Sequence, residues 1–269
     1  MEDYGIKTVS LPENRQWRCA FQDYWIEKLN AMLSLPEKIV LLALVDDEGV
    51  VGRTSHTRDY ISYALSGSII MELMLAGRVD VELPREVFLK ITKDNGKLKI
   101  VDSSPAGDEV LDEALSKIRA AGKEKSPFHW IKKLLPLTTG RNMPTFGTSF
   151  HGSRFLEQLV EKGVLYKKKH RTLGYVTPRY PLQDEAAKRS LVMSVHDAII
   201  QGSNEPEMTM LISLANVCRI LGETPYTAEE EPLVQKRVET IIKSDPVIAF
   251  LARHVALAKQ SSENPNVGS

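Results

Sequence analysis

The chain has 269 residues, of which 42 % are hydrophobic and 26 % charged, and its formal net charge at pH 7 is zero. This composition is typical of a globular protein, and the chain is long enough to bury a substantial core. A membrane-spanning helix needs roughly 20 consecutive apolar residues, which excludes the longest apolar run here, residues 39–45, from that role.

The chain opens on the acidic stretch MEDYG, with no apolar signal-peptide segment behind it. We therefore expect a cytoplasmic protein whose membrane contact is peripheral. Residues 15–34 repeat bulky apolar side chains every three or four positions, which predicts an amphipathic helix within an N-terminal extension, residues 1–34. Its aromatic face would suit a membrane interface, but its opposite face carries charges of both signs, which favours packing on the body of the protein.

Two helices are predicted next. Residues 35–51, LPEKIVLLALVDDEGVV, place Pro36 in a first helical turn, continue with an apolar run and end in an Asp-Glu-Gly turn, as a buried central helix would. The stretch 58–78 predicts a second helix, for which Gly77 is the stop signal. The small residues 66–68 in its middle allow another helix to approach closely.

Short β-prone pieces and further helices complete the chain. The β-prone pieces are residues 79–83, 87–91 and 97–102, with the turn sequence KDNGK between the last two. Residues 164–178 predict a basic two-stranded ribbon. Helices are predicted within 103–123, 127–137, 153–163, 184–202, 205–222, 227–244 and 246–260. The pattern predicts one mainly α domain, residues 35–260, in which amphipathic helices ring a central helical bundle with short β-hairpins, followed by a disordered tail, 261–269.

Groups with catalytic or metal-binding potential form no recognisable motif in the sequence. Asp112 and Glu113 are interpreted as a solvated helix face. Glu72, inside the apolar run IIMELML, must find a partner or face water, and a structural ion pair or helix-cap contact is preferred to a catalytic role. Cys19 and Cys218 are expected to be buried, reduced thiols. We predict no catalytic residue, metal or cofactor.

The zero net charge conceals a basic middle segment. Residues 114–183 hold 14 basic and 3 acidic side chains, an excess of 11 positive charges. Such a segment attracts an anionic partner if its charges share one surface. The alternative is that they spread over several faces and are neutralised by acidic side chains from the two ends of the chain.

The most basic part is the ribbon in LVEKGVLYKKKHRTLGYVTPRYPL, residues 159–182. A helix followed by a basic ribbon is also the pattern of a winged-helix DNA-binding domain, but the preceding helix carries two glutamates and few base-reading side chains. An anionic membrane surface is the other interpretation. Because strand side chains alternate, Lys167 and Lys169 share one face and Lys168 takes the other, so only part of the cluster can touch a flat partner.

Four stretches, in this order, resemble the Golgi phosphoprotein 3 family: LPEKIVLLALVDDEGVV, GSIIMELMLAGRVDVE, PAGDEVLDEALSKI and RFLEQLVEKGVLYKKKHRTLGYVTPRYPL. The resemblance covers about residues 35–255. It implies a helical domain with the basic ribbon as a β-hairpin that contributes to oligomer contacts. Eukaryotic members of the family bind phosphatidylinositol 4-phosphate at the Golgi and link glycosyltransferase tails to a vesicle coat. Nothing in that role requires catalysis.

The family's headgroup pocket carries over poorly, which indicates a divergent or prokaryotic-type member. Where the family has a tryptophan and arginines, this chain has Thr57, Ser66, Ser149 and Gly152. One arginine beside the pocket is retained, Arg154. We predict a replacement anionic-lipid site near His56 that comprises Arg58, Arg141, His151 and Arg154. The hairpin residues predicted to contact the membrane or a partner are Lys167, Lys168, Lys169 and Arg171.

These observations predict a non-enzymatic peripheral membrane protein that contacts anionic phospholipid, with phosphatidylinositol 4-phosphate selectivity left open. It would lie on the cytosolic face of a membrane, the Golgi if the source is eukaryotic. Protein clients and self-association through the hairpin are also expected. The alternatives are a protein-interaction scaffold that binds no lipid and, less favoured, a winged-helix DNA binder.

Overall fold

The structure is a computed structural model that describes residues 32–45, 48–52, 54–84, 92–138, 153–172, 175–183 and 185–263. Several predictions fall outside these residues: the N-terminal helix as far as residue 31, the β-prone piece 87–91, and the chain beyond residue 263. Predicted site and thiol residues that also lie outside are Cys19, Arg141, Ser149, His151 and Gly152.

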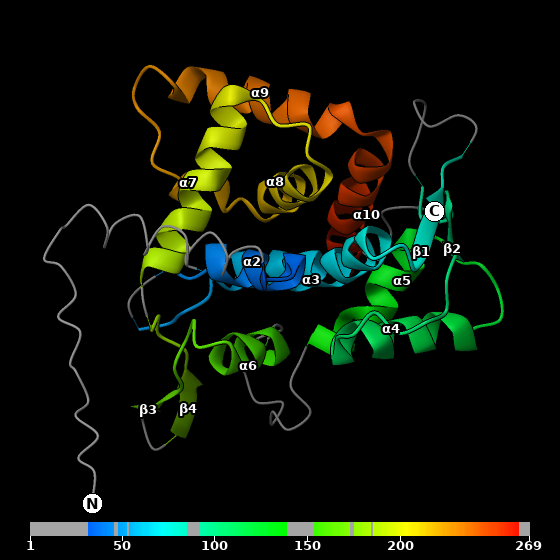
Figure 1. The fold of residues 1–269 in the computed structure, drawn as a ribbon, viewed down its shortest axis with the longest axis horizontal. Helices are drawn as coiled ribbons and strands as arrows, with labels where there is room; N and C mark the ends of the chain where they lie inside the picture. Colours follow the sequence, from blue (N-terminus) through cyan, green and yellow to red (C-terminus); the bar gives the residue numbers. More distant parts are fainter. Residues whose placement is uncertain are drawn as a thin grey trace, which may run out of the picture.

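Helix α2 (Leu35–Leu42) lies at the centre of the fold, and every one of its residues is buried. The reason is its composition, because a continuous apolar run places apolar side chains on every side of a helix and leaves no face for water. Helix α2 packs against α3 (Ser55–Leu75) and α8 (Pro206–Cys218). Helix α10 (Pro246–Glu263) packs against α3 and α8 in turn. These four helices form the predicted central bundle (Figure 1).

The small residues in the middle of α3 allow α10 to come close, as predicted. A Cβ atom on Gly67 would lie 2.4 Å from Cγ2 of Val255 in α10. Ser66 and Ser68, on either side, are fully buried. Each hydroxyl donates to a carbonyl of its own helix, at 3.4 Å to Ser62 O and 2.9 Å to Leu65 O, so neither is left unsatisfied.

Further helices surround the bundle (Figure 1). On one side lie α4 (Glu109–Ala120), α5 (Pro127–Leu134), the 3-10 turn η1 (Leu135–Thr138) and α6 (Ser153–Glu161). On the other lie α7 (Glu185–Gln201), the 3-10 turn η2 (Leu221–Glu223) and α9 (Glu231–Ser244). Helix α4 is capped by Asp108 and buries the predicted face, Val110, Leu111, Ala114, Leu115 and Ile118. The mainly α fold class is confirmed.

Two small antiparallel sheets complete the described structure. Strand β1 (Val79–Glu82) pairs with β2 (Lys97–Ile100), and the turn sequence KDNGK leads into β2. Alternation places Val79 and Val81 in the core, while Glu82 forms an ion pair with Lys99 across the sheet. Strand β3 (Lys168–Thr172) pairs with β4 (Tyr175–Arg179), which forms the predicted basic hairpin.

The base of this hairpin rests against the loop that follows α2. Gly49 in that loop has φ +74°, a region that side-chain-bearing residues rarely adopt. A Cβ atom there would lie 2.1 Å from the carbonyl carbon of Tyr180, just after β4. Only glycine therefore lets the loop seat the hairpin in this position.

Replacement of Gly49 by alanine should lower the free energy of unfolding by roughly 2 to 4 kcal/mol, because backbone strain and a backbone clash add together. Gly77 is a matched control, since its φ is +67° but no atom lies within 4 Å of the position of its missing Cβ. The Gly77→Ala variant should lose only about 1 kcal/mol. Equal losses in the two variants, measured by urea denaturation, would show that the contact with Tyr180 is unimportant.

Candidate functional site at the basic hairpin

The β3–β4 hairpin projects from the helical body beside the C-terminal end of α6 (Figure 1). The two arms are joined at their root by an antiparallel bridge between Leu165 and Leu182, both packed on the core. The backbone N–H of Tyr166 donates to Pro181 O at 3.0 Å. The hairpin is therefore anchored at its base, which fixes the direction of its basic side chains.

Glu157 of α6 holds both arms of the root. Its Oε1 accepts a hydrogen bond from Tyr180 Oη at 2.7 Å and pairs with Lys167 Nζ at 2.6 Å. Burial, together with the hydrogen bond to Glu157, raises the pKa of the Tyr180 phenol. The phenol therefore stays a neutral donor, and Lys167 is committed to an intramolecular partner. Sequence reasoning did not find this role for Glu157.

The strand register divides the remaining basic residues between two faces, as alternation predicted. Lys168 lies opposite Arg179, and its Nζ is 3.4 Å from Oε1 of Glu48. Lys169 and Arg171 are on the other face, both exposed, and neither has an acidic partner among the described residues. Val176, opposite Arg171, is 54 % exposed. We call Lys169, Arg171 and Val176 the outer hairpin face.

Arg154, the arginine retained beside the family's pocket, is held by α4. Its Nη1 is 2.7 Å from Glu113 Oε2, its Nη2 is 3.1 Å from Glu109 Oε1, and its side chain is 13 % exposed. The hydrogen bond from Arg154 lowers the pKa of Glu113. Asp112 accepts the backbone N–H of Ala106 at 2.6 Å. Asp112 and Glu113 therefore lie on a partly exposed face, as predicted, but they also make structural contacts that the sequence did not predict.

The other predicted site residues do not join Arg154 in the described structure. Arg58 Nη1 donates to Gly52 O at 3.3 Å, at the start of α3. Thr57 donates its backbone N–H to the capping hydroxyl of Thr54. Ser66 is fully buried inside the bundle, where an arginine side chain would have no room. These contacts are local and involve no other described residue of the predicted site.

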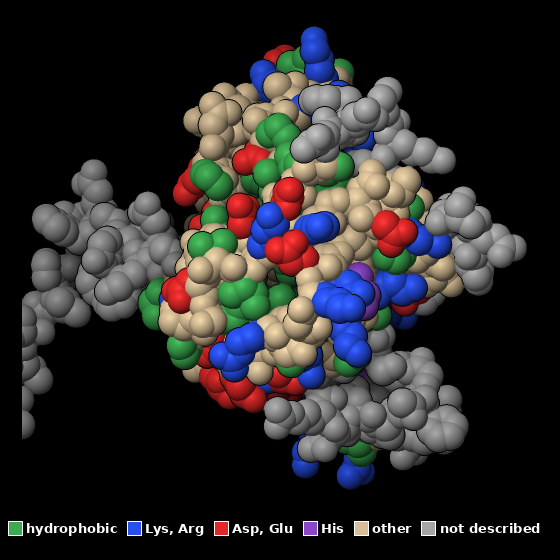
Figure 2. All heavy atoms as spheres, turned by 90° about the vertical axis from the view of Figure 1, so that its right-hand side faces the viewer, with side chains coloured by type: hydrophobic (Ala, Val, Ile, Leu, Met, Phe, Trp, Pro, Cys, Tyr) green, Lys and Arg blue, Asp and Glu red, His purple; other side chains and the backbone are tan. Residues whose placement is uncertain are grey.

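Charges of the basic middle segment are also spread over other faces. Figure 2 shows Lys and Arg side chains interspersed with Asp and Glu over the side of the molecule that carries β1, β2 and α4. The ion pair between Lys117 of the segment and Glu113 is of this kind. The neutralisation alternative is therefore correct for part of the segment, namely Lys117, Arg154, Lys162 and Lys168, and it does not hold for the outer hairpin face.

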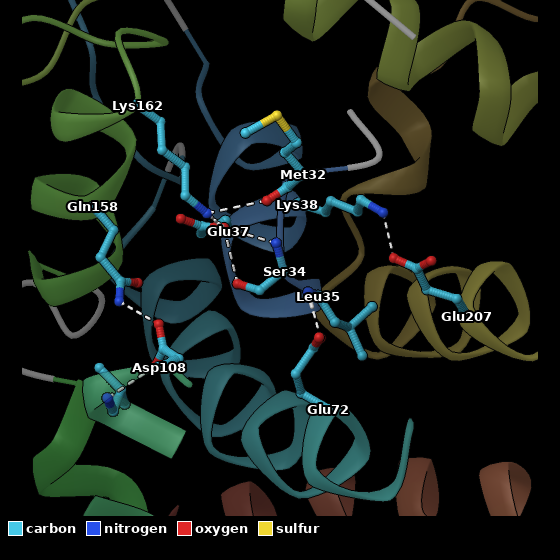
Figure 3. Close-up of polar contacts among 11 residues, drawn as sticks. Met32, Ser34, Leu35, Glu37, Lys38, Glu72, Asp108, Gln158, Lys162 and Glu207 are labelled. Atoms are coloured by element: carbon cyan, nitrogen blue, oxygen red, sulfur yellow. Dashed lines mark hydrogen bonds and ion pairs between the residues drawn. The ribbon is translucent and has the colours of Figure 1, made fainter. Parts of the chain in front are cut away.

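A buried polar network links the hairpin root to the start of α2 (Figure 3). Glu37, 1 % exposed, accepts the Ser34 backbone N–H at 2.7 Å and pairs with Lys162 Nζ at 2.6 Å. Lys162 also donates to Met32 O at 3.1 Å. Nearby, Lys38 pairs with Glu207 of α8. Because Lys162 begins the segment between α6 and the hairpin, the network fixes the root from the core side.

Glu72 completes this network as a helix-cap residue, which confirms the structural role preferred from the sequence. Its Oε2 accepts the backbone N–H of Leu35, the first residue of α2, at 2.6 Å (Figure 3). Desolvation raises the pKa of Glu72 above its ordinary value, and the Leu35 hydrogen bond opposes that shift.

Within the described ranges, no helix combines the length and apolar character needed to cross a bilayer, and no group of three or more His, Cys, Asp or Glu side chains has metal-binding geometry. Cys218 is a buried free thiol.

Two comparisons identify similar proteins. A family model described as Golgi phosphoprotein 3 (GPP34) matches residues 35–258. The chain is 27 % identical over 179 residues to vacuolar protein sorting-associated protein 74 of Eremothecium gossypii. That alignment covers 66 % of this chain and 53 % of the relative, so the chain matches about half the length of that protein.

The raised pKa of Glu72 predicts a pH-dependent stability difference between the wild type and Glu72→Gln, whose amide oxygen can still accept the Leu35 N–H. Because the folded protein favours protonated Glu72, the wild type should be most stable relative to the variant below about pH 4.5, the ordinary pKa of a glutamate. The advantage should be lost as the pH rises through the raised folded-state pKa.

Urea denaturation of both proteins between pH 4 and pH 7 tests this prediction, because all other titrations cancel in the difference. Glu239→Gln on α9 is a control of opposite sign, since neighbouring donors lower the pKa of Glu239. A Glu72→Gln difference that does not change with pH would mean that the ionised carboxylate is not penalised by burial.

Proposed function

Because the chain belongs to the Golgi phosphoprotein 3 family, we propose that it is a non-enzymatic peripheral adaptor that contacts anionic phospholipid on the cytosolic face of Golgi membranes. The observation that carries the lipid contact is the outer hairpin face, on which Lys169 and Arg171 project without a described acidic partner beside the exposed Val176. The adaptor role, with protein clients, rests on the family.

The outer hairpin face fits a flat anionic surface better than a selective headgroup pocket. Lysine and arginine near an anionic leaflet contribute about 1 kcal/mol each, so two such groups give weak, salt-sensitive attraction. The exposed apolar side chain of Val176, opposite Arg171, adds burial at the membrane interface. Positions 57 and 66 supply no basic group, and Arg154 is held by α4. We therefore propose charge-dependent contact with limited headgroup selectivity.

A nucleic acid partner is not part of the proposal. A winged-helix domain needs an exposed recognition helix in front of its ribbon. Here α6 packs against α2 and η1, its Phe155, Leu156 and Leu159 are buried, and its arginine is paired with α4. Its remaining surface includes Glu157 and Glu161, which would repel phosphate.

The Lys169→Glu/Arg171→Glu variant should lose binding to vesicles of phosphatidylcholine and phosphatidylserine by at least about 30-fold, since two attractive charges become repulsive. Lys236→Glu/Lys243→Glu on α9 makes the same change in net charge far from the hairpin (Figure 1) and should bind as the wild type does. Sedimentation at two salt concentrations measures both. Failure of the wild type to bind any anionic vesicle at low salt would reject the lipid proposal.

Self-association through the hairpin is a second candidate function, favoured by the exposure of Val176 at the protruding β4 strand. A two-stranded ribbon presents strand edges that can pair with a second copy, and an exposed apolar side chain adds to such a contact.

Val176→Asp separates the two candidates. If the outer hairpin face meets lipid, the variant should bind vesicles several-fold more weakly while its mass in solution is unchanged. If the hairpin joins two copies, light scattering should show the mass of a wild-type oligomer falling to 30.2 kDa, that of the single chain. A wild type that is monomeric at all concentrations would remove the second candidate.

A further inference from the structure

Both ends of the Arg154 guanidinium are occupied by carboxylates from α4. Nη1 contacts Glu113 and Nη2 contacts Glu109, at 2.7 and 3.1 Å. A guanidinium binds phosphate through two N–H groups in the same forked way. The two glutamates therefore occupy the positions that two phosphate oxygens would take.

Both carboxylates keep a favourable environment if Arg154 leaves them. Glu113 Oε1 is already 3.4 Å from Lys117 Nζ, one turn along α4. Glu109 is in the first turn of α4 and its side chain is 75 % exposed, so water and the positive end of the helix stabilise its charge. Separating an ion pair is costly when one partner stays buried and uncompensated, which is not the situation of these two glutamates.

The two helices also stay joined when the arginine turns away. Gln158, one turn after Arg154 on α6, donates from Nε2 to Asp108 Oδ2 at 2.7 Å (Figure 3). Asp108 in turn caps α4 by accepting two of its backbone N–H groups. A rotation of the Arg154 side chain is therefore sufficient, and no helix has to move.

We propose that Glu109 and Glu113 form an autoinhibitory lock on Arg154, which the phosphate monoester of a lipid headgroup must displace before it can bind the guanidinium. The inference rests on the proposed lipid contact and adds regulation to it. The outer hairpin face supplies the first, nonselective attraction to the membrane. Arg154, on the helix that leads into the hairpin, supplies a second contact only where phosphate monoesters are concentrated enough to displace the two glutamates.

Glu113→Gln tests the lock because it removes one competing charge and keeps the shape of the side chain. Binding to phosphatidylcholine vesicles that carry phosphatidylinositol 4-phosphate should strengthen about 3- to 10-fold, since a like charge close to the incoming phosphate is gone. Glu109→Gln, at a more exposed position, should act in the same direction. Glu239→Gln makes the same change in net charge on α9 and should have no effect.

A double-mutant cycle assigns the gain to Arg154. In an Arg154→Gln background the Glu113→Gln substitution should no longer strengthen binding. A gain that persists there, or no gain in either glutamine variant, would overturn the lock. The gain should also be absent on phosphatidylserine vesicles of equal charge, which lack a phosphate monoester, and an equal gain there would overturn the headgroup assignment.

Vesicle binding by the wild type and two variants distinguishes failure of the lock from failure of the lipid contact. If the wild type binds and Lys169→Glu/Arg171→Glu does not, while Glu113→Gln equals the wild type, the lock fails and the lipid contact stands. If neither the wild type nor Glu113→Gln binds any anionic vesicle, the lipid contact itself fails. Saturable binding of inorganic phosphate to Glu113→Gln, measured by calorimetry, would assign the arginine to free phosphate instead of lipid.

Discussion

The complete burial of helix α2 is the constraint on which the rest of the structure depends. It packs against α3, α6, α7 and α8. Its first turn lies away from water, where unsatisfied backbone N–H groups are costly. Glu72 from α3 and Glu37 from α2 itself supply the missing acceptors. Two carboxylates are thus drawn into the core by the need to cap an apolar helix.

Those carboxylates then position the surface where function is proposed. Glu37 needs a cation, and Lys162, between α6 and the hairpin, provides it. Glu157, within α6, binds Lys167 on one arm of the hairpin root and Tyr180 on the other. The hairpin is therefore positioned by paired charges that begin in the core, while Lys169 and Arg171, farther out, remain available to an outside partner.

Interactions within one element could be predicted from the sequence, whereas most interactions between distant elements could not. Helical periodicity found the buried face of α4 residue by residue, and the small residues of α3 correctly predicted a close helix contact, because both patterns can be read within a single element. The sequence did not reveal that β2 pairs with β1 or that Arg154 pairs with two glutamates of α4. Glu109 and Glu113 are more than forty positions from that arginine, and a helix pattern does not tell which exposed carboxylate a distant helix will meet. The hairpin alternation was predicted, but the acidic partners of Lys167 and Lys168 were not.

The order of residues alone accounts for the mainly helical class, the central buried helix, the basic ribbon and the family, since these follow from periodicity, apolar runs and motif order along the chain. Tertiary structure decided which charges remain free. Of the basic residues on the hairpin and α6, Arg154, Lys162, Lys167 and Lys168 are paired with carboxylates brought from other elements. The physical reason is that an ion pair acts through space over a few ångströms, so the functional charge of a basic segment is known only after the chain has folded.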